Sequence, residues 1–380
     1  MVRKAYISST NCVTPVGFDV VENFAAITRN ISAIRLYEDS SLLSVPFHAA
    51  MIDEKELDLR FARVSSSGEY TKLEKMLILA LKPVVERFVQ RPNERTGFIL
   101  STTKGNITEL ANSVSPAEVF LSSLAKKVAD YFAFESQPMV VSNACVSGIQ
   151  AVAVAKRLIE TNMYDHIFVA AGDLVSRFVL SGFQSFQAMS ADPCKPFSKD
   201  RSGVTLGEAA AAILVTVDPE NAKIAVSGAG SCNDANHISG PSRTGEGLVR
   251  SVESALKEAE MDAGQLDYIS AHGTATLYND EMEAVAINRL GLKDVPVNSF
   301  KGVYGHTLGA SGLLEAVMGI ESMMGNRLLP SFGYSESGVS QSINVIEQIE
   351  EKQINSFLKT ASGFGGCNTA VVFEKLNNGS

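Results

Sequence analysis

Two stretches of the chain repeat one local plan, in which an apolar strand leads through a glycine-containing turn into a helix of small residues. The first reads VVSNACVSGIQAVAVAKRLIE and the second reads VNSFKGVYGHTLGASGLLEAV. The segments that open and close each half also resemble each other, 4–16 with 223–234 and 203–217 with 363–373. Such a repeat favours two similar units. We therefore expect an N-terminal half, 1–218, and a C-terminal half, 219–380. The alternative, that any α/β chain shows such similarities, stays open at this point.

The apolar runs of the chain alternate between strand-like and helix-like patterns, as they do in α/β folds. Strands are expected at residues 96–101, 139–142, 166–171 and 212–217, and helices at residues 72–88, 148–161 and 246–259. The strand runs do not alternate with polar residues, which is typical of strands that are covered on both faces. The sequence therefore predicts a layered α/β fold.

The overall composition argues against several classes of protein. With 45% hydrophobic residues among 380, the chain can bury a large core. A net charge of −9 argues against nucleic acid as the main partner, because binding to phosphates needs a basic surface. No run of 18 apolar residues occurs, and the first residues read as a strand and a turn. We therefore expect neither a membrane partner nor a signal peptide, and a cytoplasmic location.

Five cysteines are scattered along the chain, and one of them has the setting of a nucleophile. Their odd number and the absence of a C-x-x-C spacing predict reduced thiols rather than disulfides or a metal site. Cys145 follows an apolar strand and precedes a helix, whose dipole and free amides favour the thiolate. The thiolate is the form that attacks a thioester. The alternative, a buried structural cysteine, fits this context equally well.

Two histidines lie in glycine-rich segments that follow strands. His272 stands in the segment AHGTAT and His306 in the segment GHTLGASG. Loops of this kind at strand ends are where α/β folds place their sites. A single such histidine would more simply satisfy loop amides, but two of them together with Cys145 favour a catalytic site. The other three histidines lack this setting and are expected to be structural: His48, His166 and His237.

Five sequence signatures follow one another along the chain: ACxSG, FSKDRSGxxxGE, AHGTxTxxND, KxxxGHxxGASG and GFGG. In this order they resemble the β-ketoacyl-acyl-carrier-protein synthases, and most of all the elongating members with a Cys-His-His triad. The resemblance extends over residues 2–376. It implies a thiolase-like α/β fold, in which two duplicated halves form a five-layered αβαβα arrangement.

The resemblance also implies roles for individual residues. Cys145 matches the acylated nucleophile, and His272 and His306 match the two catalytic histidines. Lys301 matches the lysine just before the second histidine motif, and Glu315 matches the acidic residue on the helix after it.

A glycine-rich turn near the end of the chain, SGFGGCN, matches the gate of these enzymes. Alone it is a weak signal, although its amides could bind an anion. By the resemblance, Phe364 is the gating phenylalanine, and its backbone amide forms an oxyanion hole with that of Cys145.

The implied activity is that of a β-ketoacyl synthase, an acyltransferase. An acyl group on Cys145 would undergo decarboxylative Claisen condensation with malonyl carrier protein, in fatty-acid-like or polyene/polyketide chain elongation. No cofactor or metal is expected, because the acyl carrier protein delivers the phosphopantetheine arm as part of the substrate. We expect a homodimer, or a heterodimer with a chain-length-factor-like subunit, formed through an edge strand near residues 166–171. The basic residues expected to receive the acidic carrier protein are Arg60, Arg63, Lys72, Lys75, Lys126 and Lys127.

Departures from the family pattern concern the substrate rather than the chemistry. Leu277-Tyr278 stands where proline is usual, Ser362 replaces a phenylalanine, and the region 112–136 is short. These changes favour a specialised pathway, such as that of a polyene-type pigment, over housekeeping fatty-acid synthesis. Two alternatives are a thiolase, with Cys367 as its second cysteine, and a non-catalytic chain-length partner. The partner normally lacks the nucleophile, so the presence of Cys145 with both histidines argues against it.

Overall fold

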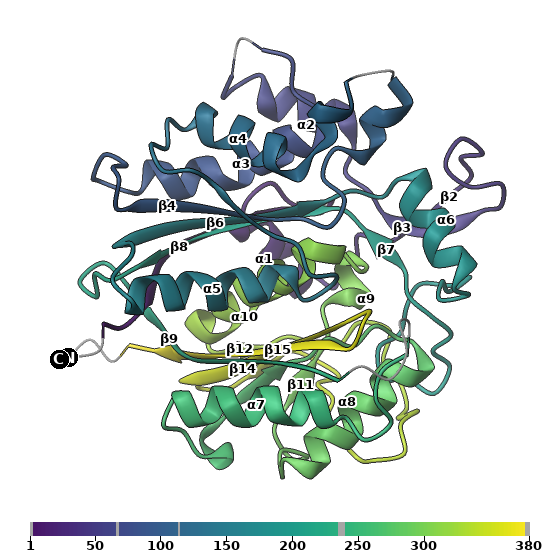
Figure 1. Ribbon diagram of the computed structural model, residues 1–380. Coiled ribbons are helices and arrows are strands. Elements are labelled where there is room, and N and C mark those ends of the chain that lie inside the picture. The colour runs from purple at the N-terminus through teal and green to yellow at the C-terminus, as the bar shows by residue number, and fades with distance from the viewer. Residues whose placement is uncertain (1–2, 66–67, 113–114, 235–239, 377–380) are drawn as a thin grey trace.

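The computed structural model describes residues 3–65, 68–112, 115–234 and 240–376 (Figure 1). Within these residues the main sheet has ten strands in the order β11-β10-β14-β15-β9-β1-β8-β6-β4-β5. The five strands from the first half are β1 (Tyr6–Val13), β4 (Thr96–Ser101), β5 (Met139–Val141), β6 (His166–Asp173) and β8 (Ala209–Thr216). The five from the second half are β9 (Ile224–Asn233), β10 (Tyr268–Ser270), β11 (Val297–Asn298), β14 (Ser356–Gly363) and β15 (Cys367–Lys375).

The strand order is the same in both halves when it is read from the centre of the sheet outward. The first half runs β1-β8-β6-β4-β5 and the second runs β9-β15-β14-β10-β11. In each half the first two pairings are antiparallel and the last two are parallel. This matching topology confirms the duplicated thiolase-like fold that the sequence predicts.

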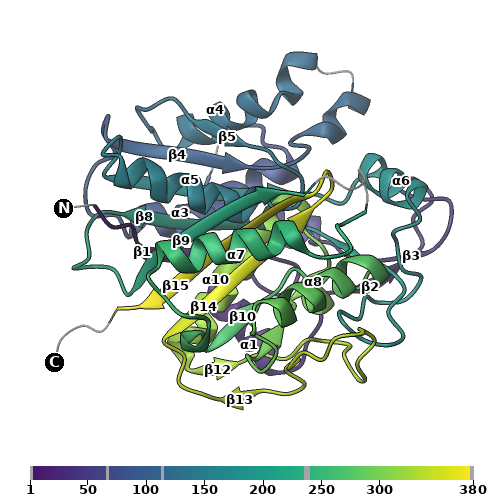
Figure 2. The same ribbon diagram turned by 60° about the horizontal axis from the view of Figure 1, so that its bottom comes forward.

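Helices cover the strands in alternating layers. Figure 1 shows α5 and α10 between the two halves of the sheet, α3 and α4 outside the first half, and α7 and α8 outside the second. Figure 2 shows α7 lying across β9 and β15. The helices are α1 (Val20–Thr28), α2 (Glu54–Phe61), α3 (Lys72–Glu86), α4 (Leu121–Tyr131), α5 (Ser147–Glu160), α6 (Arg177–Ser185), α7 (Glu246–Glu258), α8 (Leu277–Arg289), α9 (Lys301–Tyr304) and α10 (Ser311–Gly325). The expected five layers are therefore present.

Shorter elements complete the structure. Two small sheets are formed by β2 (Arg35–Tyr37), β3 (Phe47–Ala50) and β7 (Leu206–Gly207), and by β12 (Arg327–Leu328) and β13 (Glu350–Glu351). The 3-10 turns are η1 (Ile107–Asn112), η2 (Pro116–Val119), η3 (Ala263–Gln265) and η4 (Leu308–Ala310). None of the helices in the described ranges has the length and apolarity needed to cross a lipid bilayer.

The predicted strands and helices agree with the structure to within three residues at each end. Every residue of β6 and β8 is buried, as expected for strands covered on both faces. The expected edge strand, however, is wrong. β6 is hydrogen-bonded to β8 on one side and to β4 on the other, and the edge of the first half is β5. The long, fully buried β6 reflects this central position, and the shorter β5 gives a weaker signal.

The two central helices meet at a pair of glycines, one from each half. A Cβ atom on Gly148 of α5 would lie 2.7 Å from the backbone nitrogen of Leu313, and one on Gly312 would lie 2.6 Å from that of Ile149. No side chain fits at such distances, so the close contact between the two helices requires the glycine at the second position of each helix. This contact fixes the start of α5, near Cys145, against the start of α10, near His306.

Candidate active site

Cys145 lies in the turn between β5 and α5, one residue before the residue that caps the helix. Ala144 has a φ of 44°, in the left-handed region that residues with a side chain rarely adopt. The Ser147 hydroxyl holds the turn, accepting from the amide of Asn143 at 2.7 Å and donating to the carbonyl of Ala144 at 2.6 Å. Strain of this kind persists only where the surrounding structure fixes it, and it gathers at functional sites.

The environment of the Cys145 thiol differs from the sequence-based expectation. Burial, and to a lesser degree the charge of Cys367, raises the pKa of Cys145 to about 12. The ammonium of Lys301 and the backbone N–H of Phe364 lower the pKa but do not outweigh burial. The structure therefore favours the protonated thiol in the free protein, contrary to the expectation, because burial disfavours the charged form more than Lys301 and the Phe364 amide favour it.

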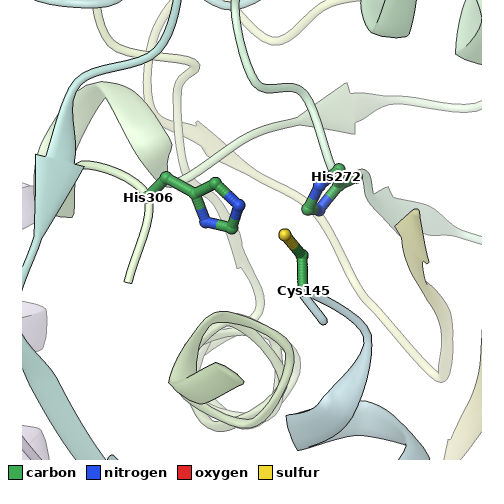
Figure 3. Close-up of side chains that lie close together, drawn as sticks. All are labelled: Cys145, His272 and His306. Atoms are coloured by element: carbon green, nitrogen blue, oxygen red, sulfur yellow. The ribbon is translucent and has the colours of Figure 1, made fainter. Parts of the chain in front are cut away.

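His272 and His306 come from the second half and meet Cys145 where the halves face each other. His272 follows β10, and His306 follows α9 and Gly305. The Cys145 sulfur and one ring nitrogen of each histidine all lie within 4.8 Å of one another. Figure 3 shows the two rings facing the sulfur, with their centroids 5.3 Å apart and their planes at 85°. The structure thus brings together the three residues that the sequence predicts.

Both imidazoles are held in one tautomer. Nδ1 of His306 accepts the backbone N–H of Leu308 at 3.3 Å and lies 2.9 Å from the Ser311 hydroxyl, which can also donate to it. Nδ1 of His272 lies 3.2 Å from the ammonium of Lys301. Burial lowers the pKa of both histidines well below the usual value, so both rings are neutral. A neutral ring that accepts at Nδ1 carries its proton on Nε2. The site therefore offers two Nε2–H donors.

A thiol and two imidazoles at this spacing are also groups that could serve as zinc ligands. Zinc needs a lone pair on the nitrogen that approaches it, however, and the hydrogen bonds at Nδ1 place the ring proton on Nε2. The arrangement suits hydrogen-bond donation better than metal binding.

Lys301 and Glu315 lie behind His272 rather than beside Cys145. Lys301 Nζ donates to the His272 carbonyl at 2.5 Å and to Glu315 Oε1 at 2.7 Å. Sequence reasoning missed Lys359, whose Nζ lies 2.6 Å from Glu315 Oε2. The one signal for it was a charged residue inside the otherwise uncharged strand SFLKTASG. All three side chains are buried.

Two further carboxylates behind the histidines were not singled out from the sequence. Glu283 accepts the backbone amides of His272 at 2.8 Å and Gly273 at 2.6 Å. Asp280 accepts the amide of Phe197 at 2.7 Å, and burial together with the charge of Glu283 raises its pKa to about 7. Asp280 stands within the AHGTxTxxND signature, and Glu283 follows it on the same buried face of α8, which could have identified both.

Two family models match the chain consecutively. The beta-ketoacyl synthase N-terminal domain matches residues 7–220, and the C-terminal domain of the same family matches residues 224–335. The chain belongs to the β-ketoacyl synthase family. It is a 3-oxoacyl-[acyl-carrier-protein] synthase type of acyltransferase, with the Cys-His-His triad of the condensing enzymes.

Individual relatives are named either as 3-oxoacyl-[acyl-carrier-protein] synthases or as polyketide synthases. A putative mitochondrial 3-oxoacyl-[acyl-carrier-protein] synthase of Schizosaccharomyces pombe is 27% identical over 98% of this chain and 99% of its own length. A putative polyketide beta-ketoacyl synthase 1 of Streptomyces halstedii is 31% identical over 66% of this chain and 64% of its own.

Solved structures share the fold over almost the entire chain. A ketosynthase in complex with its chain length factor from Xenorhabdus doucetiae has a TM-score of 0.87 at 25% identity, covering 98% of both chains. A type II polyketide acyl carrier protein in complex with its ketosynthase, bound to the hexaketide, has a TM-score of 0.84 at 21% identity, covering 99% of this chain and 100% of that one.

The glycine turn of this β-ketoacyl synthase brings Phe364 beside Cys145. Gly365 and Gly366 have φ of 87° and 81°, which only glycine adopts without strain. A Cβ atom on Gly363 would lie 3.2 Å from the Cys145 nitrogen, so the turn adjoins the nucleophile. The Phe364 ring stacks on Phe183, with centroids 5.7 Å apart, and meets the edge of Phe186 at 5.5 Å. Sequence reasoning did not identify these two aromatic partners on and beside α6.

Among the described residues, the other histidines and cysteines do not join the cluster. His48 Nδ1 lies 2.7 Å from the carbonyl of Ala191, and buried His166 lies 2.9 Å from the hydroxyl of Thr216. His237 lies outside the described residues. Cys367 contacts the carbonyl of Phe364 at 3.5 Å, and among the described residues it is not a member of the group around Cys145.

Proposed function

We propose that Cys145 carries the growing acyl chain and that His272 and His306 stabilise the carbanion formed from a malonyl thioester. The observation that carries this proposal is the convergence of one thiol and two neutral imidazoles within 4.8 Å. Lys301 and Glu315 act as positioning residues, because Lys301 contacts His272 and Glu315 in turn contacts Lys301.

In the first half-reaction the acyl group moves from the carrier protein to Cys145. The sulfur attacks the thioester carbonyl, the carrier's C–S bond breaks, and the proton of the Cys145 thiol ends on the departing pantetheine thiol. The enzyme therefore has no net gain or loss of a proton in this step, and the proton that burial keeps on the Cys145 thiol leaves with the pantetheine thiol. The backbone N–H groups of Cys145 and Phe364 stabilise the tetrahedral oxyanion.

In the second half-reaction the malonyl thioester loses CO2, and negative charge develops on its thioester oxygen. The two Nε2–H groups of His272 and His306 donate to that oxygen, an interaction that strengthens as the charge develops. The carbanion attacks the acyl carbonyl on Cys145, the C–S bond breaks, and the released thiolate takes up a proton. Its raised pKa favours this last step.

The pathway we propose is specialised polyene or polyketide elongation. The support comes from Ser362, Leu277-Tyr278 and Cys367, which stand where the family usually has other residues. A relative named as a putative polyketide beta-ketoacyl synthase supports this proposal. The cytoplasmic location stays a prediction, since one relative is named as a mitochondrial protein.

We further propose that the protein is a dimer formed through β5, as a homodimer or with a chain-length-factor-like subunit. The two outer edges of the sheet differ. On β11, Val297 exchanges hydrogen bonds with Asn344 and Ile346, which cover that edge. On β5, the described residues provide no comparable cover on its outer side, and an open edge is a site for pairing with another chain. For the division of the chain, we propose a boundary between the halves at 218/219, in the segment between β8 and β9.

The proposed substrate partner is an acyl carrier protein. A structurally similar ketosynthase has been solved in complex with such a carrier protein. A thiolase is disfavoured, because Cys367 lies outside the group of atoms around Cys145 in the described chain. A non-catalytic chain-length partner is disfavoured by the complete triad.

The test separates the two half-reactions. His272→Ala and His306→Ala should still accept an acyl group on Cys145, which intact mass detects, but CO2 release from malonyl carrier protein should fall by about 10²–10³ for each lost donor. His48→Ala, whose ring lies against Ala191, is the control and should keep both activities. Unchanged CO2 release in both active-site variants would contradict the roles proposed for the histidines.

A further inference from the structure

Lys359 lies at the centre of a buried polar network that the two half-reactions do not explain. Its side chain is fully buried on β14, and its Nζ donates to the carbonyls of Ser270 and Ala271, each at 3.1 Å. These are the two residues directly before His272. The same Nζ lies 2.6 Å from Glu315 Oε2. A buried ammonium is costly unless it is paired and hydrogen-bonded, so these contacts fix its place.

The carboxylate of Glu315 is shared between two lysines. Oε1 accepts from Lys301 at 2.7 Å, and Oε2 lies 2.6 Å from Lys359. Lys301 in turn donates to the carbonyl of His272 and contacts its Nδ1. Lys359 thus reaches His272 by two routes, through the end of β10 and through Glu315 and Lys301.

We propose that Lys359 is a positioning residue for the condensation reaction, which sets the place and the protonation of His272 by holding β10 and Glu315. This inference rests on the proposed roles of the histidines and assigns a further residue to the same site. The contacts of Lys359 are with Ser270, Ala271 and Glu315 rather than with Cys145, so they act on the position of His272. Besides burial, its charge lowers the pKa of His306 as well as that of His272.

The charges around His272 indicate what loss of Lys359 would do. Lys301 contacts the ring itself, Glu283 on α8 accepts the backbone N–H of His272, and Glu315 on α10 and Lys359 lie behind Lys301. Burial is the main cause of the lowered pKa of His272, and the charges of Lys301, His306 and Lys359 lower it further. Removing one positive charge makes protonation of the ring easier, so the pKa of His272 should rise in a variant without the ammonium.

The experiment compares Lys359→Met with wild type by two measurements. In protein labelled with 15N-histidine, the ring nitrogen shifts report the tautomer and protonation of His272. Wild type should hold the Nε2–H form, and the variant should become protonated at a higher pH. CO2 release from malonyl carrier protein should fall about 10- to 100-fold through misplacement of the donor, while acylation of Cys145 changes little. Lys359→Gln, which keeps donors but not the charge, should show the same pKa change, and it carries the test if the methionine variant does not fold.

Lys156→Met is the matched control. Lys156 is as deeply buried and is paired with Glu160 and with Glu258 at 3.1 Å, but it lies toward the other end of α5. It should lose stability without moving the His272 titration or CO2 release. A wild-type titration in Lys359→Met, or an equal shift in Lys156→Met, would overturn the inference. The NMR titration needs no substrate, so it stands apart from a failure of wild-type CO2 release, which would instead contradict the proposed function.

Discussion

At the scale of single residues, the site works through neutral groups placed by their neighbours. Burial keeps the Cys145 thiol protonated and both imidazoles neutral. Charge is held one step away, on Lys301 and Glu315. Such a site stabilises charge only when the reaction creates it, which is what lowering a barrier requires.

The Cys145 thiol should titrate as a group with a raised pKa. Below the pKa of a thiol, its thiolate fraction grows about tenfold per pH unit. The rate at which iodoacetamide alkylates Cys145 should therefore rise about tenfold for each pH unit between about pH 6 and 9. Peptide mapping assigns the label, and Cys232, the one partly exposed cysteine among the described residues, is the internal reference. A Cys145 rate that levels off below about pH 7 would show a lowered pKa and contradict the effect of burial.

At the scale of elements, the halves are joined by helices that begin alike. α5 and α10 both start with Ser-Gly, and each glycine lies against the backbone of the other helix. Cys145 and His306 lie just before these starts. The distance between nucleophile and histidine is therefore set by a backbone contact rather than by flexible side chains.

Gly312→Ala should destabilise the protein and separate these two residues. The added Cβ would lie 2.6 Å from the backbone nitrogen of Ile149, which cannot move without displacing α5. Overpacking of this kind costs about 1–3 kcal/mol, measured as the free energy of unfolding in denaturant, and CO2 release should fall with it. Gly264→Ala, whose Cβ would meet nothing within 4 Å, is the control. Equal stability of the two variants would refute the role of the glycine contact.

At the scale of the whole molecule, the structure changes the expectation for carrier-protein docking. Most of the basic residues expected to form the docking surface are paired within the chain. Lys72 lies 2.7 Å from buried Glu208, and Lys75 lies 2.7 Å from Asp58. Arg60 pairs with Glu56, and Lys127 pairs with buried Glu74. Reversing Lys72 would place two carboxylates together in the interior, so this residue is unsuited to a docking test.

Arg63 and Lys126 are exposed and suit that test better, because the ion pair that Lys126 forms with Asp130 at 2.8 Å is itself exposed on α4. Reversing both charges should lower kcat/KM for acyl carrier protein donors more than for the matching coenzyme A donors, because rim charges act on the association rate. The difference should shrink as salt is added. Lys199→Glu, an exposed change beside Glu336 of the second half, is the control. Equal losses with both donors would exclude this surface as the docking site.

The protein should be a dimer through β5. Light scattering should give twice the mass of one chain, and hydrogen exchange should show protected amides on the outer side of β5 only in the dimer. The matching edge, β11, is covered by residues 344–346 and should be protected in either state. A fully active monomer would contradict the proposal.

The sequence by itself determined the duplicated fold, the approximate bounds of the few strands and helices that it predicted, and the identities of Cys145, His272 and His306. These follow from local patterns: apolar runs define buried strands, and glycine turns mark where loops approach a site. Only the tertiary structure decided the protonation of the thiol, the edge strand, and the contacts of Lys359 and Glu283. Burial and pairing depend on segments distant in the chain, as when β14 brings Lys359 beside the end of β10. A local pattern carries no information about such contacts, because the free energy of a charge is set by what surrounds it.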